Sequence, residues 1–503
     1  MSGSIKTSTP SSESLPWLNL VSYLQESPAF RHGEDVNLYE GRTFKEVFFS
    51  FFFFALYFSF FSSDLLALSS EQQATEQRLN LLYRSGRFEE ASRMARTLLQ
   101  KNPSCFSCWM VIGESALGRG NLELAREAFH RALKIQPEER RPKALLKEIY
   151  IREDRYSLAA PLAYELGELG LGDLLKSFHK DQKPFAVDST REQVAVRFKD
   201  FVPYPIIETE LSGGIKARFM IDTGSTYVIL SPRLANKAQM ELFRKEKETG
   251  TMGSYWIQFG KIHSMNIGGA TIRNVPAVVH SLLAIPRTGL EIDGILGENF
   301  LSHFLPTFDL RGRWKSGPKF FILRFSKEDP LSSFKSLSLS NGRIRAIPFL
   351  IGPAQTLVVQ GKINNSMPLL FLLDTGTPGY FICSPLVAKL SKVWLEQNFF
   401  SDQSGPYIHH KSGQSIDMHW GLGTSQSPLE LGLANQLEIM GERIRGILQG
   451  GVGSLPMDMS GNLGFWTGGM IGFGFFYDQV STIDYKNQTI YFFIPDQRAS
   501  QHK

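Results

Sequence analysis

Two short acidic segments carry the residue types that acid–base chemistry needs. One reads D-T-G-S at residues 222–225, the other reads D-T-G-T at residues 374–377, and each follows an apolar, strand-like run. A carboxylate beside buried apolar residues costs free energy unless it is hydrogen-bonded or has a functional role. Because the arrangement occurs twice in one chain, we expect Asp222 and Asp374 to act as a pair.

A pair of carboxyl groups can hydrolyse an amide without a metal ion or a covalent intermediate. The reaction needs a base that activates water and an acid that protonates the leaving nitrogen. Two close carboxyl groups that share one proton supply both, since their like charges resist double ionisation. The sequence does not decide whether Asp222 or Asp374 holds the proton, and the pair predicts an acidic to mildly acidic optimum.

The region from about residue 194 onward is predicted to be mainly β-structure, because short apolar runs alternate with glycine and proline. It divides into two halves that share landmarks. The segments "DGILGENFLSHFLPTFD" at 293–309 and "GGMIGFGFFYDQVSTID" at 468–484 align without a gap when Gly294 is matched to Gly469. The two halves are therefore expected to repeat one architecture.

A second segment competes for this alignment. "GILQG" at 446–450 follows Asp374 at the same spacing as "GILGE" follows Asp222. The residues after it do not continue the pattern, so we reject that pairing. The second half then has about 23 additional residues, which we expect in an irregular, glycine-rich loop over 446–468.

These halves resemble the aspartic peptidases, and "GILGENFL" with the short halves resembles most the retropepsin-like branch. The resemblance covers roughly 300 residues. It implies a mainly-β bilobal fold with pseudo-twofold symmetry and both halves in one chain. It also implies that a water molecule is held between the catalytic carboxylates of Asp222 and Asp374, with no cofactor and no metal ion. The alternative, in which each aspartate only caps a turn and has no catalytic role, explains a single segment better than it explains two.

The same resemblance assigns supporting roles around the two aspartates. In the family, the glycines of each segment allow close backbone approach, the threonines after the aspartates tie the two loops together, and the fourth residues hydrogen-bond the carboxylates. The positions concerned are Thr223, Gly224, Ser225, Thr375, Gly376 and Thr377. A β-hairpin flap covers the cleft in the family, and 250–269 is the candidate here, with Tyr255 and Trp256 near its tip; an ordinary surface hairpin is the alternative.

A helical repeat with a period of 34 residues precedes the β-rich region. It resembles tetratricopeptide repeats and implies an α-helical array of stacked hairpins over residues 70–167, the third unit being degenerate. Such an array usually binds a partner protein or a neighbouring domain. The alternative is that it only holds the peptidase part at a distance from the membrane, and both interpretations stay open. The recurring positions are Gly86, Ala91 and Pro103, followed by Gly120, Ala125 and Pro137.

Cys105 and Cys108 form a C-x-x-C at the start of a repeat helix. A redox motif needs a strand-to-helix setting, and a metal site needs further ligands, so neither is predicted. A local disulfide and two packed thiols remain, and we favour the packed thiols.

The most apolar part of the chain is the phenylalanine-rich segment 44–66. It is long enough to cross a bilayer, and the basic residues before it favour a single-pass anchor with the C-terminal domains outside the cytoplasm. A cleaved secretory signal and a buried helix are the alternatives. Residues 1–43, rich in Ser, Glu and Pro, are predicted to be disordered.

Composition fits a multidomain globular chain, with 42% hydrophobic and 20% charged residues and a net charge of +5. The sequence contains no long basic run, so nucleic-acid binding is not predicted. The predicted function is a membrane-tethered aspartic endopeptidase that acts on polypeptides. A peptide-binding protein without catalysis and a self-processing enzyme are the alternatives. After the repeats, the predicted order is a linker over 168–193, a first lobe over 194–330 and a second lobe over 340–497.

Overall fold

The computed structural model describes residues 70–179, 182–250, 253–280, 292–311, 319–327, 329–332, 334, 337, 342–395, 430–453 and 463–495. The chain forms two compact units, Met1–Thr75 and Glu76–Lys503. Of the first unit only residues 70–75 are described, at the start of helix α4 (Ser70–Arg84). The segment 1–43 predicted to be disordered lies outside the described residues.

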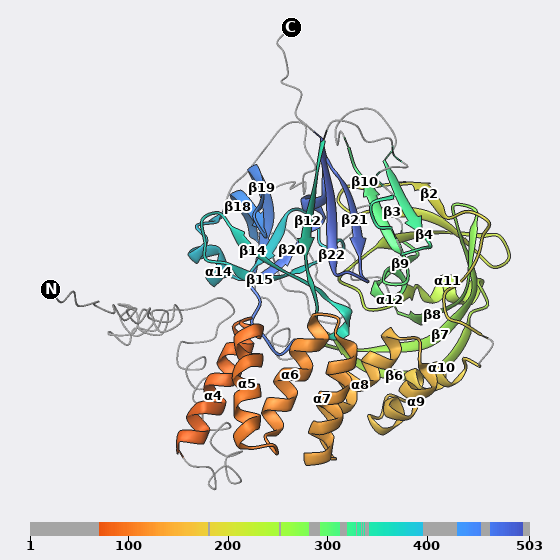
Figure 1. Ribbon diagram of the computed structural model, residues 1–503. Helices are drawn as coiled ribbons and strands as arrows, with labels where there is room; N and C mark the ends of the chain where they lie inside the picture. The colour runs from red at the N-terminus through yellow and green to blue at the C-terminus, as the bar shows by residue number, and fades with distance from the viewer. Residues whose placement is uncertain are drawn as a thin grey trace, which may run out of the picture. The chain divides into compact units, whose positions relative to one another are not determined.

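The chain from residue 70 to residue 179 is an array of helical hairpins (Figure 1). Small residues at the repeat positions allow the helices to pack closely, since Ala91, Ala125 and Ala159 are fully buried. The turns between paired helices contain Gly86 and Gly120, whose φ angles of 79° and 71° favour glycine. The helical half of the predicted fold class is confirmed. Its helices are α4, α5 (Phe88–Lys101), α6 (Phe106–Gly118), α7 (Leu122–Ile135), α8 (Arg140–Arg152), α9 (Tyr156–Glu165) and α10 (Leu169–Lys176).

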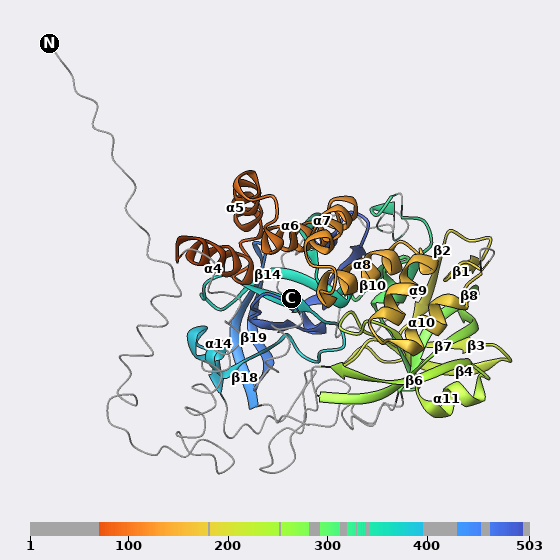
Figure 2. The ribbon, with the colours of Figure 1, turned by 90° about the horizontal axis from the view of Figure 1, so that it is seen from below.

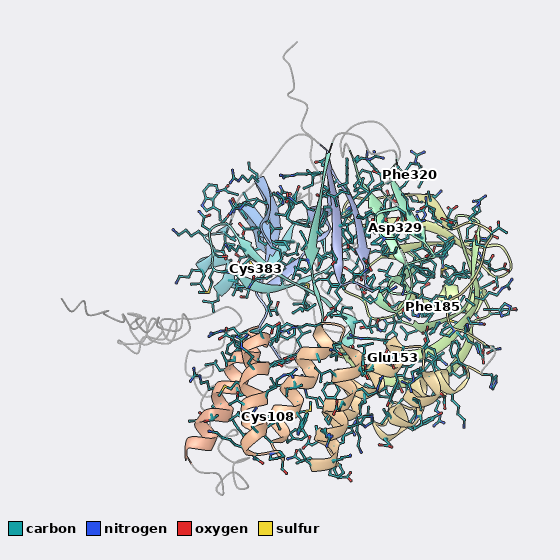
Figure 3. The ribbon with its side chains drawn as sticks, in the orientation of Figure 1. Cys108, Glu153, Phe185, Phe320, Asp329 and Cys383 are labelled. Atoms are coloured by element: carbon teal, nitrogen blue, oxygen red, sulfur yellow. A yellow bond between two sulfur atoms is a disulfide. The ribbon has the colours of Figure 1, made fainter. Side chains whose placement is uncertain are left out.

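The C-x-x-C segment contains a disulfide between Cys105 and Cys108. The prediction of two packed thiols is therefore wrong. Cys105 caps the N-terminus of α6, and its Sγ accepts a hydrogen bond from the Cys108 amide at 3.2 Å. This cap brings the two side chains together, and both are buried (Cys108 is labelled in Figure 3).

The interval 168–193, predicted as a linker, contains ordered structure. Helix α10 lies in it, and strand β1 (Ala186–Asp188) pairs with β8 (Ala270–Val279). The first lobe therefore includes residues that lie before its predicted start at residue 194.

The first lobe is built on an eight-stranded sheet with the order β1-β8-β5-β9-β4-β3-β7-β6. Two short helices, α11 (Pro232–Lys237) and α12 (Glu298–Leu301), follow β5 and β9. The remaining strands are β3 (Ile206–Leu211), β4 (Ile215–Ile221), β5 (Val228–Leu230), β6 (Glu241–Gly250), β7 (Gly253–Ile267) and β9 (Gly294–Leu296).

The second lobe repeats this topology in an eight-stranded sheet with the order β13-β14-β15-β20-β16-β19-β18-β17. Helix α14 (Pro385–Leu390) follows β16 as α11 follows β5. The strands are β13 (Leu350–Ile351), β14 (Leu357–Ile363), β15 (Leu369–Leu373), β16 (Phe381–Cys383), β17 (Trp394–Leu395), β18 (Glu430–Ile439), β19 (Glu442–Val452) and β20 (Gly469–Ile471). The bilobal half of the fold prediction is confirmed.

The competing "GILQG" segment at 446–450 lies inside β19, whereas Gly469 begins β20. The alignment of Gly294 with Gly469 is therefore confirmed. Residues 446–452 of the interval expected as an irregular loop lie in β19, so that expectation is wrong for them, and residues 454–462 lie outside the described residues. The longer connection of the second half falls between β17 and β18.

A six-stranded sheet joins the lobes, with the order β12-β22-β21-β10-β11-β2 (Figure 1). At its centre Thr307 pairs with Thr482, and their hydroxyl oxygens lie 2.7 Å apart. These threonines occupy matched positions in the two halves, so the pseudo-twofold axis passes between them. The strands are β2 (Gln193–Arg197), β10 (Leu305–Asp309), β11 (Phe320–Arg324), β12 (Gly342–Pro348), β21 (Val480–Asp484) and β22 (Thr489–Pro495).

The predicted membrane anchor is corrected. The longest helix among the described residues, α4, has 15 residues, which extends roughly 22 Å at 1.5 Å per residue and is shorter than a bilayer core. No helix in the described ranges is long and apolar enough to span a membrane. The segment 44–66 lies outside those ranges. A single-pass, membrane-anchored chain with the membrane as a partner is therefore not supported.

Packing between α6 and α7 gives a test of the array. A Cβ added to Gly113 would lie 2.5 Å from the Phe129 ring, whereas a Cβ added to Gly118 in the same helix meets its nearest atom at 4.0 Å. We expect Gly113→Ala to lower the free energy of unfolding by about 1–3 kcal/mol through overpacking. Gly118→Ala is the control and should leave stability unchanged or slightly higher. Urea denaturation followed by circular dichroism at 222 nm measures both, and equal stability of the two variants would contradict the packing.

Candidate active site

Asp222 and Asp374 lie at the ends of equivalent strands in the two lobes. Asp222 follows β4 and Asp374 follows β15. Each strand pairs in parallel, in the same register, with the short strand that begins at Gly294 or Gly469. The two acidic loops are therefore placed by one structural unit that the chain uses twice.

The threonines after the aspartates lock the two loops together. Thr223 Oγ1 donates to the Leu373 carbonyl at 2.9 Å, and Thr375 Oγ1 donates to the Ile221 carbonyl at 2.8 Å. Each hydroxyl also accepts the backbone N–H of the other threonine, at 3.0 Å in both directions. Both side chains are buried, at 1% and 0% exposure. Four buried hydrogen bonds thus fix the loops across the pseudo-twofold axis.

The glycines of the two segments allow the carboxyl groups to meet. A Cβ added to Gly224 would lie 2.5 Å from the Asp374 carboxyl carbon, and a Cβ added to Gly376 would lie 2.5 Å from that of Asp222. Each glycine N–H donates to its own aspartate at 2.8 Å. The two carboxyl groups lie close enough for the charge of Asp374 to raise the pKa of Asp222. The residues predicted as a pair are therefore brought together.

The fourth residues of the segments differ in what they bind. Thr377 Oγ1 donates to Asp374 Oδ2 at 2.6 Å, as the resemblance implied. Ser225 Oγ donates instead to the Tyr227 carbonyl at 3.1 Å, so the structure contradicts the expected serine–carboxylate bond. The reason is loop length: β5 begins one position sooner after its aspartate than β16 does, which brings the Tyr227 carbonyl back to Ser225. The pair is thus asymmetric.

Comparison with known families supports this geometry. A family model described as aspartyl protease matches residues 207–300, which contain the first acidic segment and its glycine landmark. A model described as tetratricopeptide repeat matches residues 77–140. A search of curated proteins finds no match to the chain.

The chain contains a retropepsin-like aspartyl protease domain preceded by tetratricopeptide repeats. The aspartyl protease match lies within the first lobe, and the repeated topology of the second lobe relates it to the first. The resemblance inferred from the two acidic segments is confirmed.

The environment of the aspartyl protease pair favours a neutral Asp222. Burial, the nearby charge of Asp374 and the hydrogen bond between the two carboxyl groups raise the pKa of Asp222 well above its usual value. The backbone N–H groups of Gly224 and Ser225 act in the opposite direction but do not outweigh these causes. One proton is therefore retained by the pair into the range where an isolated aspartate is ionised.

Two residues near the pair, Glu298 and Tyr204, were missed by the sequence analysis. Glu298 is buried, accepts a hydrogen bond from the Tyr485 hydroxyl at 2.9 Å, and has a pKa raised mainly by burial. Tyr204 is buried as well, and its pKa is raised by burial and by the charges of both aspartates. Glu298 directly follows Gly297, which the alignment matches to Gly472, but the second half has Phe473 at the next position, so comparison of the halves gave no signal.

The predicted flap segment forms one arm of a β-hairpin. Strands β6 and β7 pair as far as Gly250 and Gly253, close to the tip of the hairpin. Tyr255 and Trp256 follow Gly253 by two and three positions. Residues 251–252 lie outside the description, as does the Tyr255 side chain. The Trp256 side chain is 66% exposed. A role of this hairpin as a flap stays a prediction.

The threonine lock can be tested by removing one hydroxyl. Thr223→Val leaves the Leu373 carbonyl and the Thr375 N–H without partners in a buried site, so the free energy of unfolding should fall by about 2–4 kcal/mol. Thr223→Ser keeps the hydroxyl and is the matched control. Urea denaturation compares the two variants, and a valine variant as stable as the serine variant would show that the lock does not hold the lobes.

The raised pKa of Asp222 predicts a stability that falls with increasing pH. The folded chain keeps the Asp222 proton at pH values where the unfolded chain, with a value of 3.8, has lost it. The folded state then binds more protons, so the free energy of unfolding decreases as pH rises from that value to the raised pKa. Asp222→Asn does not titrate, and its stability advantage over the wild type should grow through this window.

Urea denaturation at a series of pH values measures that advantage. Asp188→Asn, at a side chain that is 65% exposed, is the control and should follow the wild type. An Asp222→Asn advantage that stays constant or shrinks with pH would contradict a raised pKa.

Proposed function

We propose that the chain is an aspartic endopeptidase that activates one water molecule between Asp222 and Asp374. The observation that carries the proposal is the meeting of two carboxyl groups from separate lobes, held by the reciprocal bonds of Thr223 and Thr375. The aspartyl protease match over 207–300 supports the reaction class. We take the substrate to be an unstructured polypeptide, because only an extended chain would reach two carboxyl groups that lie between two lobes.

The asymmetry of the pair assigns its members different tasks. Asp374 receives hydrogen bonds from the Gly376 N–H and the Thr377 hydroxyl, an arrangement suited to an ionised carboxylate, which only accepts. It removes a proton from the water, whose oxygen attacks the substrate carbonyl carbon. Asp222, which keeps its proton, donates it to the carbonyl oxygen. Asp374 then gives its new proton to the amide nitrogen, and Asp222 takes a proton back from a hydroxyl of the tetrahedral intermediate. The C–N bond breaks to leave an amine and a carboxylic acid, and the pair returns to its starting state.

Other parts of the chain receive supporting roles in this proposal. Gly224, Gly376, Ser225 and Thr377 shape the two loops, and the β6–β7 hairpin with Tyr255 and Trp256 lies over the bound peptide. The tetratricopeptide repeats contact another protein, as their family match suggests. No cofactor is required.

Single substitutions of the two aspartates test the proposal. Purified full-length protein is incubated with unfolded casein across pH 3.5–7, and peptides are counted by mass spectrometry. Asp222→Asn and Asp374→Asn should each lower cleavage about 10²–10⁴-fold, the usual contribution of acid–base catalysis. Asp188→Asn is the control and should cleave like the wild type. Cleavage that persists in both active-site variants, or that increases above pH 8, would overturn the proposal.

A further inference from the structure

The strands that lead into the active site have two differently covered faces. In β4, Phe219 and Ile221 belong to the core of the lobe, whereas Met220 belongs to another cluster. Side chains alternate along a strand, so Met220, two positions before Asp222, lies on the face that leads to the Asp222 carboxyl. The same alternation puts Ile229 of β5 and Ile295 of β9 on that face. Under the proposed function, this face forms the floor of the substrate groove in the first lobe.

Helices of the repeat array cover this floor. Met220, Ile229 and Ile295 share one buried apolar cluster with α9 and α10, and all three are less than 5% exposed. The cluster extends to Ile257 and Phe259 on the β6–β7 hairpin. Figures 1 and 2 both show α9 and α10 beside β6 and β7. The helical residues of the cluster are Tyr156, Ala159, Ala160, Ala163, Leu171, Leu174 and Leu175.

Polar contacts fasten α10 to the hairpin. The Gly170 N–H donates to Glu246 Oε2 at 2.6 Å. Arg244 of β6 donates twice to Asp173 of α10, at 2.6 and 3.1 Å. The predicted flap is therefore fastened to the repeat array.

Helix α8 is hydrogen-bonded to the second lobe, close to the loop of Asp222. Both Glu148 carboxylate oxygens accept backbone N–H groups of the second lobe, from Ala354 at 3.2 Å and Gln355 at 3.3 Å. Arg152 donates to the Gly352 carbonyl at 2.8 Å. The Ala354 carbonyl in turn accepts the hydroxyl of Thr226, which lies four positions after Asp222.

The second lobe is covered in the same way. Leu372, two positions before Asp374, lies in an apolar cluster with Met470 of β20. Phe88 at the start of α5 packs against this cluster and contacts the Phe465 ring at a centroid distance of 5.5 Å. Helices α5, α8, α9 and α10 thus lie over the groove-facing surfaces of both lobes.

We propose that the repeat array occupies the substrate groove and keeps the peptidase latent. The inference rests on the proposed function, since a latent enzyme must be an enzyme. A substrate polypeptide reaches Asp222 and Asp374 only when α9 and α10 leave the β6–β7 hairpin. The repeats are then an intramolecular inhibitor as well as a partner-binding module.

Substitutions that loosen α10 in the full-length chain test this. Leu174→Asp places a charge in the buried cluster and should raise casein cleavage at least about tenfold, since the closed form then loses a buried apolar contact. Arg244→Glu opposes Asp173 at a partly exposed site and should raise cleavage about threefold, in keeping with a surface ion pair. The exchanged pair Asp173→Arg with Arg244→Glu restores opposite charges and should return cleavage to the wild-type rate.

A second readout does not depend on catalysis. A fluorescent statine-containing peptide, the type of inhibitor that mimics the hydrated amide, should bind Leu174→Asp more tightly than the wild type by a similar factor. Hydrogen exchange of α9 and α10 should accelerate in Leu174→Asp while the interlobe sheet stays protected, which shows that the variant is folded.

The outcomes separate the inference from the proposed function. Tighter inhibitor binding without cleavage by any variant would support a repeat array that fills the groove and would refute the proposed enzymatic function. A wild type that cleaves casein and binds the inhibitor as well as both loosened variants would overturn the inference of latency, while the proposed enzymatic function would stand. Loosened variants with weaker inhibitor binding and lower cleavage than the wild type would also overturn it, since the array would then support the groove rather than fill it. If Leu174→Asp fails to fold, Arg244→Glu and its exchange partner decide the question by the same measurements.

Discussion

The reciprocal bonds between Thr223 and Thr375 are the constraint on which the site depends. Each hydroxyl donates to the opposite strand and accepts from the opposite loop, so neither loop keeps its shape without the other. Two carboxyl groups repel when ionised, and only a rigid frame keeps them adjacent. The buried lock supplies that frame, and the closely approaching glycines leave room for the carboxyl groups. Burial raises the pKa of Asp222, and this enforced contact with Asp374 raises it further.

Repetition within the chain made the architecture predictable. The register of Gly294 beside β4 and of Gly469 beside β15 could be predicted because a gapless match of landmarks implies equivalent strands. The 34-residue period likewise predicted close-packed helices at Ala91 and Ala125, since only small residues fit there. In both cases, one local pattern determined one local geometry.

Features that depend on a one-residue difference or on distant packing could not be predicted. The Ser225 hydroxyl turns away from its aspartate because its loop is one residue shorter, which composition does not show. The Cys105–Cys108 disulfide depends on the cap geometry of α6. Helix α10 resembled part of a linker because its apolar side chains find partners in β-strands tens of residues later in the chain.

The repeat array and the two lobes pack against each other as one structural unit. Helix α8 contacts Ala354 of the second lobe, and α10 contacts the β6–β7 hairpin. These contacts connect the helices to the surroundings of Asp222. A crystal structure of the full-length chain with a statine-containing peptide tests the central claim most directly. We predict that the inhibitor hydroxyl lies within hydrogen-bond distance of both Asp222 and Asp374, in the position of the attacking water. A bound inhibitor whose hydroxyl contacts neither carboxyl group, in a complex with both loops well ordered, would contradict it.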